Sequence, residues 1–361
     1  MDILLETRNL TTQLVTQDGT VTAVDHVNLK VRRGKILALV GESGSGKSMT
    51  CASLLGLLPP NGRIVEGEVL FDGADLVRMR PRQLRALRGK RIGMVLQDAM
   101  TALNPLLTIG DQIAEVFRWH HGITDRATLQ RLSIEALEAV RIPAAAERLD
   151  SYPFQFSGGM RQRVCIAINL ACAPDLLICD EPTTALDVTV QMQILGLLKS
   201  LQASRQLTIV FVTHDLQLAS QFCDDVAIMY AGRVVEQGPI ADVFAQPVHP
   251  YTEGLLRAVP SLHDRDAALR TIPGTPPLAR AWTDGCRFAA RCPEADARCH
   301  ARYPNWFAWQ EDQRRVACWH TVQRVQRWAS RFGADHETDH EPNNETDHEP
   351  DHESDHARRV A

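Results

Sequence analysis

No hydrophobic run in this sequence is long enough to cross a bilayer. A membrane-spanning helix needs about 20 consecutive apolar residues, whereas the hydrophobic residues, 44 % of the chain, are spread over much shorter segments. The first residues, MDILLETRNL, also lack the basic start and apolar stretch of a signal peptide. We therefore expect a cytosolic protein that reaches a membrane only through a partner.

An excess of basic residues is also absent. The formal net charge is −5, and residues 335–361 alone hold ten acidic residues and two arginines. Residues 1–334 are then close to neutral, at +3. Because no broad basic stripe is present, we expect no nucleic-acid partner.

Disulfides are not expected, because a reducing compartment keeps thiols reduced. Five of the nine cysteines lie among apolar neighbours and are interpreted as small core residues. The other four are grouped late in the sequence and require another explanation. They are Cys286, Cys292, Cys299 and Cys318.

The sequence changes character twice along its length. Over residues 1–245, short apolar segments such as 35–40 and 176–179 alternate with helical periodicity, which predicts an α/β domain with a parallel sheet. Prolines and tryptophans are then concentrated in a second region, 246–330. Residues 331–361 repeat Asp-His-Glu units and are expected to be disordered. The histidines of this tail allow weak nickel or zinc binding, although a solvated tail is the simpler interpretation.

The segment GESGSGKS, residues 41–48, fits a phosphate-binding loop between a predicted strand and a predicted helix. Its glycines let backbone amide groups point at a phosphate, and the helix N-terminus adds positive partial charge. The ammonium group of Lys47 would neutralise the β- and γ-phosphates, and the Ser48 hydroxyl would bind Mg²⁺. The residues expected to bind ATP are Gly41, Ser43, Gly44, Ser45, Gly46, Lys47, Ser48 and Met49.

Two carboxylates, Asp180 and Glu181, end the apolar segment LLIC. A buried strand presents acids only at its tip, where Asp180 can hold Mg²⁺ through water and Glu181 can accept a proton from an attacking water. The alternative is a plain charge pair at a strand end. The phosphate-binding loop earlier in the chain favours the functional interpretation.

A third motif, FSGGMRQ at residues 156–162, opens a predicted helix ahead of the acidic strand. Ser157 can cap this helix, and Gly158 and Gly159 can expose amide groups to an anion. Taken alone, Ser-Gly-Gly is usually just a loop. Its position between the phosphate-binding loop and the two carboxylates favours a role in anion binding over a plain loop.

These motifs together resemble those of the ABC ATPases, over about residues 4–245. FSGGMRQ is similar to the family signature, with Phe156 in place of the usual leucine. Gln97 resembles the Q-loop glutamine, residues 184–187 the D-loop and His214 the switch histidine. The resemblance implies a RecA-like core with a parallel sheet, an antiparallel β subdomain and an α-helical signature subdomain.

The resemblance also implies a mechanism. Glu181 would be the catalytic base, His214 would hold the γ-phosphate and the attacking water, and Gln97 would contact Mg²⁺. Two domains would clamp two ATP molecules head to tail, so that Ser157, Gly158 and Gly159 of one domain serve the nucleotide of the other. Asp187 of the D-loop would also belong to the nucleotide site.

One departure from the family concerns adenine, which usually stacks on an aromatic residue upstream of the P-loop. This chain has no aromatic residue before Phe71. Adenine would therefore rest on aliphatic groups near residues 18–24 or be held by the partner.

Within the family, the sequence is similar to the oligopeptide, dipeptide and nickel importer ATPases. The similar segments are QDAMTALNP at 97–105, HPYTEGLL at 249–256 and IPGTPP at 272–277. The resemblance implies a peripheral subunit on the cytoplasmic face of the inner membrane that drives uptake of di- and oligopeptides. The alternative cargo is nickel, a metal chelate or an opine-like solute.

The same resemblance implies the partners: a second, non-identical ATPase, two membrane-embedded permease subunits and, indirectly, an extracytoplasmic solute-binding protein. A non-transport ABC ATPase of DNA repair or translation is the rival. Such proteins carry long coiled coils or two cassettes in one chain, and this sequence has one cassette and no heptad run.

The four late cysteines could hold either zinc or an iron–sulfur cluster, since both accept four thiolates. Gaps of five, six and eighteen residues separate them, and these are wider than the paired knuckles typical of zinc. The family resemblance also points to a [4Fe-4S] cluster, which we expect, with zinc or unligated thiols as alternatives. Because the group lies outside every motif that touches phosphate, its expected role is structural or redox-sensing.

Overall fold

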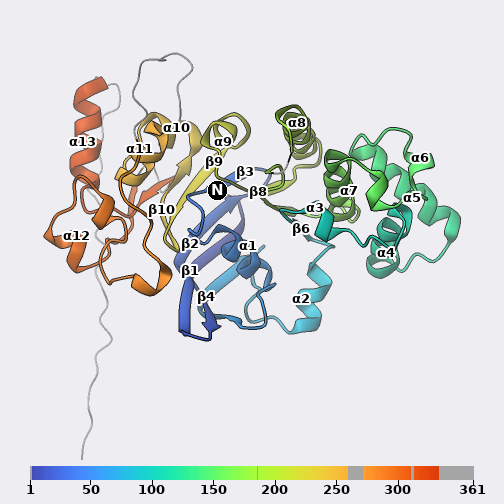
Figure 1. Cartoon of the computed structure of the whole chain (residues 1–361), viewed down its shortest axis with the longest axis horizontal. Coiled ribbons are helices and arrows are strands. Elements are labelled where there is room, and N and C mark those ends of the chain that lie inside the picture. The colour runs from blue at the N-terminus through green and yellow to red at the C-terminus, as the bar shows by residue number, and fades with distance from the viewer. Residues whose placement is uncertain (1, 185, 259–270, 310–312, 333–361) are drawn as a thin grey trace, which may run out of the picture.

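The computed structural model describes residues 2–184, 186–258, 271–309 and 313–332. It contains two β-sheets with helices packed around them (Figure 1). Within the described ranges, no helix combines the length and the apolar character needed to span a membrane. Residues 333–361 of the predicted tail lie outside the described part.

The larger sheet has eight strands in the order β11-β12-β10-β9-β3-β8-β7-β6. Their bounds are β3 (Ile36–Val40), β6 (Ile92–Val95), β7 (Leu176–Asp180), β8 (Thr208–Thr213), β9 (Asp225–Tyr230), β10 (Arg233–Pro239), β11 (Phe307–Trp309) and β12 (Arg314–Val316). The five strands from β9 to β6 are parallel, and β10, β12 and β11 continue the sheet antiparallel. This arrangement confirms the predicted α/β domain.

Strand β3 shows how the sheet is stabilised on both faces. Successive side chains of a strand point to opposite faces. Ile36 and Val40 accordingly join the hydrophobic core that the main sheet shares with the helices on one of its faces. Leu37 and Leu39 join the core on the other face, which is shared with the second sheet. Every residue of β3 is buried, which explains the unbroken apolar run in the sequence.

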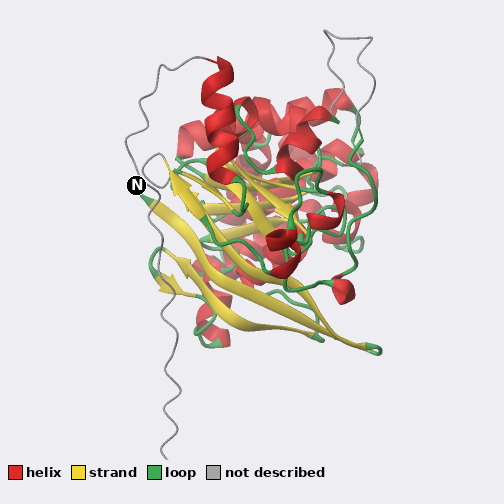
Figure 2. Cartoon of the chain, turned by 90° about the vertical axis from the view of Figure 1, so that its left-hand side faces the viewer, coloured by secondary structure: helices red, strands yellow, loops and turns green. Residues whose placement is uncertain are grey.

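The second sheet has the order β2-β1-β4-β5. Its bounds are β1 (Ile3–Thr16), β2 (Gly19–Arg32), β4 (Gly62–Phe71) and β5 (Ala74–Asp75). Figure 2 shows its long strands below the main sheet and the helices. Register shifts such as the one between Thr7 and Leu10 let the two 14-residue strands β1 and β2 stay paired along their length.

Thirteen α-helices are found in the described ranges. They are α1 (Lys47–Leu55), α2 (Pro81–Leu87), α3 (Ala99–Ala102), α4 (Ile109–His121), α5 (Arg126–Ala139), α6 (Ala145–Arg148), α7 (Gly158–Leu170), α8 (Val188–Arg205), α9 (Leu216–Phe222), α10 (Ile240–Ala245), α11 (Pro250–Arg257), α12 (Ala297–Ala301) and α13 (Thr321–Phe332). Thr108 and Asp125 cap α4 and α5, since their side chains accept bonds from backbone N–H groups of the first turn.

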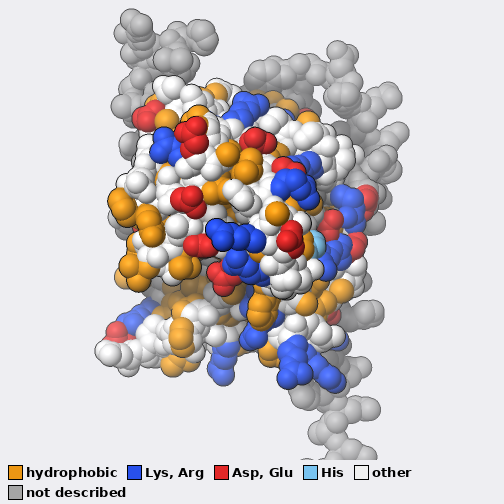
Figure 3. Space-filling view, turned by 90° about the vertical axis from the view of Figure 1, so that its right-hand side faces the viewer, with side chains coloured by type: hydrophobic (Ala, Val, Ile, Leu, Met, Phe, Trp, Pro, Cys, Tyr) orange, Lys and Arg blue, Asp and Glu red, His pale blue; other side chains and the backbone are white. Residues whose placement is uncertain are grey.

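Helices α4–α7 lie together at one end of the molecule, which confirms the expected helical subdomain (Figure 1). Seen from that end, hydrophobic side chains are interspersed with basic and acidic ones (Figure 3). The signature helix α7 therefore stands apart from α1, which follows the P-loop near the middle of the molecule.

The region after α10 packs onto the main sheet. Strand β12 pairs with β10, so that Glu236 lies opposite Val316. The Nη2 atom of Arg314 lies 3.1 Å from Oε1 of Glu236, and the two side chains are 2 % and 0 % exposed. Removing one partner of a buried ion pair leaves an uncompensated charge, so this pair fixes the C-terminal region to the sheet.

Candidate functional site

The P-loop joins the end of β3 to the start of α1. Gly44 and Gly46 have φ angles of +77° and +102°, which favour glycine. A Cβ atom on Gly41 would lie 2.1 Å from the carbonyl oxygen of Met229. The hydroxyl of Ser45 is buried and has no hydrogen-bond partner among the described residues. A tight loop with an unsatisfied inward hydroxyl fits a bound phosphate.

Lys47 is buried inside this loop. Its Nζ atom donates to the carbonyl oxygens of Gly41 at 2.9 Å and Glu42 at 3.0 Å. Burial lowers the pKa of the ammonium group, and the carboxylates of Glu181 and Asp180 oppose that shift. The loop's own carbonyl groups thus hold the ammonium group of Lys47.

Ser48 and Asp180 meet at the carboxyl ends of β3 and β7. The hydroxyl of Ser48 donates to Oδ1 of Asp180 at 3.1 Å. Burial raises the pKa of Asp180, and the hydrogen bond from Ser48 opposes the shift. A hydroxyl and a carboxylate that share one edge of the sheet are oxygen ligands of the kind Mg²⁺ prefers, so these residues fit the expected cation.

Glu181 follows β7, and three other motif residues converge on its carboxylate. Its Oε2 atom lies 2.9 Å from Oγ1 of Thr184, 3.4 Å from Nδ1 of His214 and 3.5 Å from Nε2 of Gln97. The backbone of Glu181 has a φ angle of +45°, which non-glycine residues rarely adopt. Backbone strain of this kind concentrates at functional sites. The structure therefore assembles the expected Q-loop, D-loop and switch residues around one candidate base.

The signature motif forms the N-terminus of α7. The hydroxyl of Ser157 accepts a hydrogen bond from the N–H group of Met160 at 3.3 Å. Ser157 and Gly158 are exposed, whereas a Cβ atom on Gly159 would lie 2.3 Å from Cγ1 of Val190. Phe156 is buried at the leucine position, 3 % exposed. Figure 1 shows that α7, the helix that carries these groups, lies apart from α1, which follows the P-loop of the same chain.

Three further predicted residues have local roles. Asp187 caps α8 by accepting a hydrogen bond from the N–H group of Val190 at 2.9 Å. Ser43 is exposed at the surface of the P-loop. Met49 packs against the core between the two sheets. Their expected contacts with nucleotide remain predictions.

The four late cysteines line one small cavity, together with apolar groups that include Phe288 and Trp319. Burial raises the pKa of Cys286 to about 11 and the pKa of Cys318 to about 12. Backbone N–H groups donate to both sulfur atoms and oppose these shifts. Because the fold brings all four cysteines to this one cavity, the cavity fits a group that is held by several sulfur ligands.

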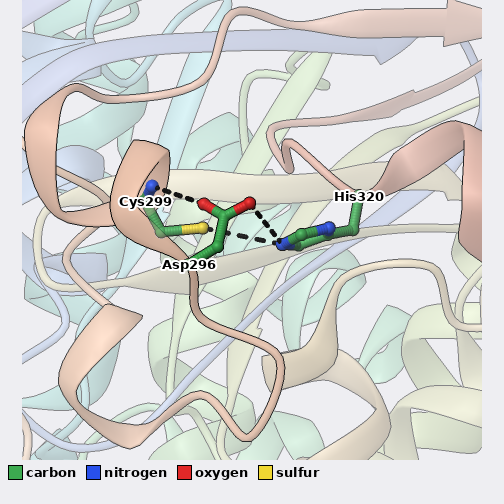
Figure 4. A group of neighbouring side chains, drawn as sticks. All are labelled: Asp296, Cys299 and His320. Atoms are coloured by element: carbon green, nitrogen blue, oxygen red, sulfur yellow. Dashed lines mark hydrogen bonds and ion pairs between the residues drawn. The ribbon is translucent and has the colours of Figure 1, made fainter.

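A second arrangement of metal-binding atoms includes one of the same cysteines. Asp296, Cys299 and His320 each offer an atom, and these atoms lie within 4.8 Å of one another (Figure 4). The Nε2 atom of His320 lies 3.8 Å from Sγ of Cys299 and 3.7 Å from Oδ2 of Asp296. Such a mixed set of oxygen, nitrogen and sulfur suits zinc better than an iron–sulfur cluster. Sequence reasoning missed Asp296 and His320, whose only signal was proximity to Cys299 and Cys318.

Two protein-family models match the sequence. The ABC transporter model covers residues 24–184, and the model of the oligopeptide/dipeptide transporter C-terminal region covers residues 235–299. The dipeptide transport ATP-binding protein DppD of Bacillus subtilis is 46 % identical over 90 % of this chain and 97 % of its own length. The oligopeptide transport ATP-binding protein OppD of Salmonella typhimurium is 48 % identical over 84 % of this chain and 90 % of its own length.

A similar solved structure is the dimeric ABC transporter cassette MJ0796 in a post-hydrolysis state with ADP and Pi. It is 29 % identical, with a TM-score of 0.59, and the match covers 65 % of this chain and 98 % of that cassette. The similarity agrees with a P-loop, a strand-end carboxylate and a capped signature helix in one α/β fold. The chain therefore belongs to the ABC transporter family, as an ATP-hydrolysing subunit that carries the oligopeptide/dipeptide transporter C-terminal region.

Proposed function

We propose that the protein hydrolyses ATP to drive the uptake of dipeptides and oligopeptides through a membrane importer. One observation carries the proposal: a P-loop with its candidate base and the oligopeptide/dipeptide C-terminal region occur in one chain. The relatives DppD and OppD, which match along most of their length, are both named for peptides. Peptides are therefore better supported than nickel, metal chelates or opine-like solutes.

In the proposed reaction, Lys47 turns from the loop carbonyls to the β- and γ-phosphates of ATP. Bound Mg²⁺, held by Ser48 and Asp180 with Gln97 nearby, would neutralise phosphate charge. Glu181 accepts a proton from the attacking water, and His214 orients that water and the γ-phosphate. Phosphoryl transfer depends mainly on positioning and charge stabilisation, which agrees with a site where four motif residues meet.

We propose that the subunit works at the cytoplasmic face of the inner membrane with a second, non-identical ATPase and two permease subunits. A solute-binding protein would deliver the peptide. The helical end exposes large apolar side chains, with Leu106 82 %, Phe154 70 % and Trp119 67 % exposed. Exposed apolar groups between charged ones, as in Figure 3, suit contact with another protein, so this end is the proposed contact with a permease.

The proposed division of the chain has three parts. Residues 1–245 form the nucleotide-binding domain, and residues 246–330 form the C-terminal extension with the four cysteines. Residues 331–361 form the acidic, histidine-containing tail, most of which lies outside the described ranges.

Transport is tested in a bacterial strain that lacks its own peptide importer ATPases and expresses this protein with its permeases and binding protein. We expect uptake of a radiolabelled dipeptide with the native chain, and none with a chain in which Glu181 is replaced by Gln. ⁶³Ni²⁺ is supplied in parallel. Uptake of nickel without uptake of any di- or oligopeptide would contradict the proposed cargo, since both assays share the same ATPase.

For the four cysteines we propose a [4Fe-4S] cluster held by Cys286, Cys292, Cys299 and Cys318. The shared cavity, which also contains the apolar side chains of Phe288 and Trp319, supports it. When bound, such a cluster would supply a rigid cross-link or one-electron redox chemistry. The alternative is zinc, which the mixed group of Asp296, Cys299 and His320 favours.

Metal analysis separates these alternatives. Anaerobically purified protein is expected to contain about four iron and four acid-labile sulfide per chain, and to absorb broadly near 400 nm, roughly as Fe–S chemistry requires. Cys292→Ser should abolish the absorbance near 400 nm. Cys172→Ser should retain it, because Cys172 lies outside the cavity. One tightly held zinc per chain that is lost in His320→Ala would instead establish the mixed zinc site.

A further inference from the structure

An arginine of the C-terminal extension binds the P-loop directly. Arg291 forms two bonds to the carboxylate of Glu42, the second residue of the loop: Nη1 to Oε2 at 2.7 Å and Nη2 to Oε1 at 3.1 Å. The two residues are 249 positions apart in the sequence. A bidentate arginine–carboxylate pair fixes orientation as well as distance, so it determines where the side chain of Glu42 points.

The surroundings of Arg291 hold its guanidinium group in one place. The side chain is 5 % exposed. Its Nε atom donates to the carbonyl oxygen of Pro273 at 2.9 Å, and Nη1 also lies 3.3 Å from the hydroxyl of Tyr230. The positive charge also lies near the aromatic rings of Tyr230 and Phe288. An arginine anchored on several sides can serve as a rigid support for a flexible loop.

A tyrosine of the extension reaches the same point of the loop. The N–H group of Glu42 donates to the hydroxyl oxygen of Tyr251 at 3.1 Å. The Tyr251 side chain is fully buried and stacks at an angle on Tyr230. Both the backbone and the side chain of Glu42 are therefore held by residues outside the ATPase fold.

The other end of the P-loop is supported by a second arginine of the extension. Ser45 accepts a backbone hydrogen bond from Gly232 at 2.8 Å. Arg287 donates to the carbonyl oxygen of Ala231 and pairs with Asp25, and its guanidinium group lies 3.6 Å from the ring centre of Trp282. A Cβ atom on Gly232 would lie 2.3 Å from the Trp282 ring, so the ring closes over this backbone.

We infer that Arg291 is a positioning residue of the nucleotide site, which holds Glu42 so that the start of the P-loop keeps the shape that binds phosphate. The carbonyl oxygen of Glu42 is one of the two that accept hydrogen bonds from Lys47. Displacement of Glu42 therefore shifts the loop together with the ammonium group of Lys47. The inference rests on nucleotide binding at the P-loop, and it is independent of which metal the cysteines hold.

The test is a double-mutant cycle on the purified subunit, with a fluorescent ATP analogue as the probe. Arg291→Ala and Glu42→Gln are each expected to weaken binding about tenfold. The double variant should bind no more weakly than the poorer single variant, because residues that act as one unit are not additive. Arg291→Lys keeps the charge but loses the fork, so its affinity should lie between those of the native protein and Arg291→Ala.

The matched control is Arg257→Ala. Arg257 also belongs to the extension, and among the described residues it pairs with Glu253 of its own helix rather than with the loop. The affinity of this variant for the analogue should therefore match that of the native protein. In the assembled importer, the KM for ATP should rise in Glu42→Gln while kcat at saturating ATP changes less than twofold. A purely structural role would instead lower the yield of active protein and leave KM unchanged.

Unchanged affinity in folded Glu42→Gln, or fully additive losses in the double variant, would overturn the inference. Should Arg291→Ala fail to fold, Glu42→Gln and Arg291→Lys still decide the matter. Metal content is measured in each variant, so that loss of metal from the neighbouring Cys292 is not mistaken for loss of the ion pair. A native subunit that does not bind the analogue would refute nucleotide binding itself.

Discussion

Replacing Glu181 by Gln is expected to leave ATP binding intact while ATP hydrolysis falls by about 10²–10⁴-fold, the loss typical of a missing general base. Glutamine has nearly the same size as glutamate and can still accept the hydrogen bond that Thr184 gives to Oε2. It cannot take a proton from water, however. The loss should therefore appear in turnover and not in nucleotide affinity.

The measurement compares ATP turnover of the assembled importer with binding of a labelled nucleotide. In MgATP, the variant should also accumulate as a closed dimer, which size-exclusion chromatography detects. Glu66→Gln is the matched control, because Glu66 is an exposed glutamate of β4 in the second sheet and not of the helical end. Near-normal turnover of Glu181→Gln would show that another group accepts the proton, and His214, 3.4 Å away, would be the first to test.

Features that depend on neighbouring residues in the chain could be predicted from the sequence. The P-loop is predictable because its glycines and Lys47 are contiguous and follow an apolar strand. That strand is β3, whose residues are all buried. Asp180 and Glu181 are predictable for a similar reason, since acidic residues at the tip of a buried strand need a function or a partner. Parallel strand ends then bring Ser48 and Asp180 together at one edge of the sheet.

Features that depend on distant contacts could not be predicted in this way. The long strands β1 and β2 require bulges whose positions no periodicity indicates. The late cysteines also lie far along the chain from every motif that is expected to touch phosphate. In the fold, however, Arg291, next to Cys292, binds Glu42 of the P-loop. The sequence around Glu42 or Arg291 does not indicate this contact, because glutamate and arginine are frequent residue types in most proteins and the two positions are far apart in the chain. The same holds for His320, which only the fold brings to Cys299.

The second large effect is expected from Ser157→Arg. Ser157 is exposed at the N-terminus of α7, and Figure 1 shows this helix apart from the P-loop of its own chain. Free amide groups and a helix N-terminus bind anions well, so the exposed signature suits the nucleotide of a partner. An arginine side chain placed there would block that nucleotide and remove the cap of α7.

Hydrolysis at the partner's P-loop should fall by about 10²-fold or more, as when donors to a developing charge are lost, while residues 41–48 of this chain still bind ATP. Photolabelling with azido-ATP reports the occupancy of each subunit separately, and phosphate release reports turnover. Ser157→Ala removes the hydroxyl without adding bulk or charge, at a cost of about 1 kcal/mol for the lost cap, so turnover should fall less than in Ser157→Arg. Ser204→Arg places the same charge on the exposed surface of α8 and should have no effect.

If Ser157→Arg instead emptied the P-loop of its own chain, the signature would act in cis and the head-to-tail arrangement would be wrong. Loss of hydrolysis with that P-loop still labelled is the result that only a signature acting on the partner produces.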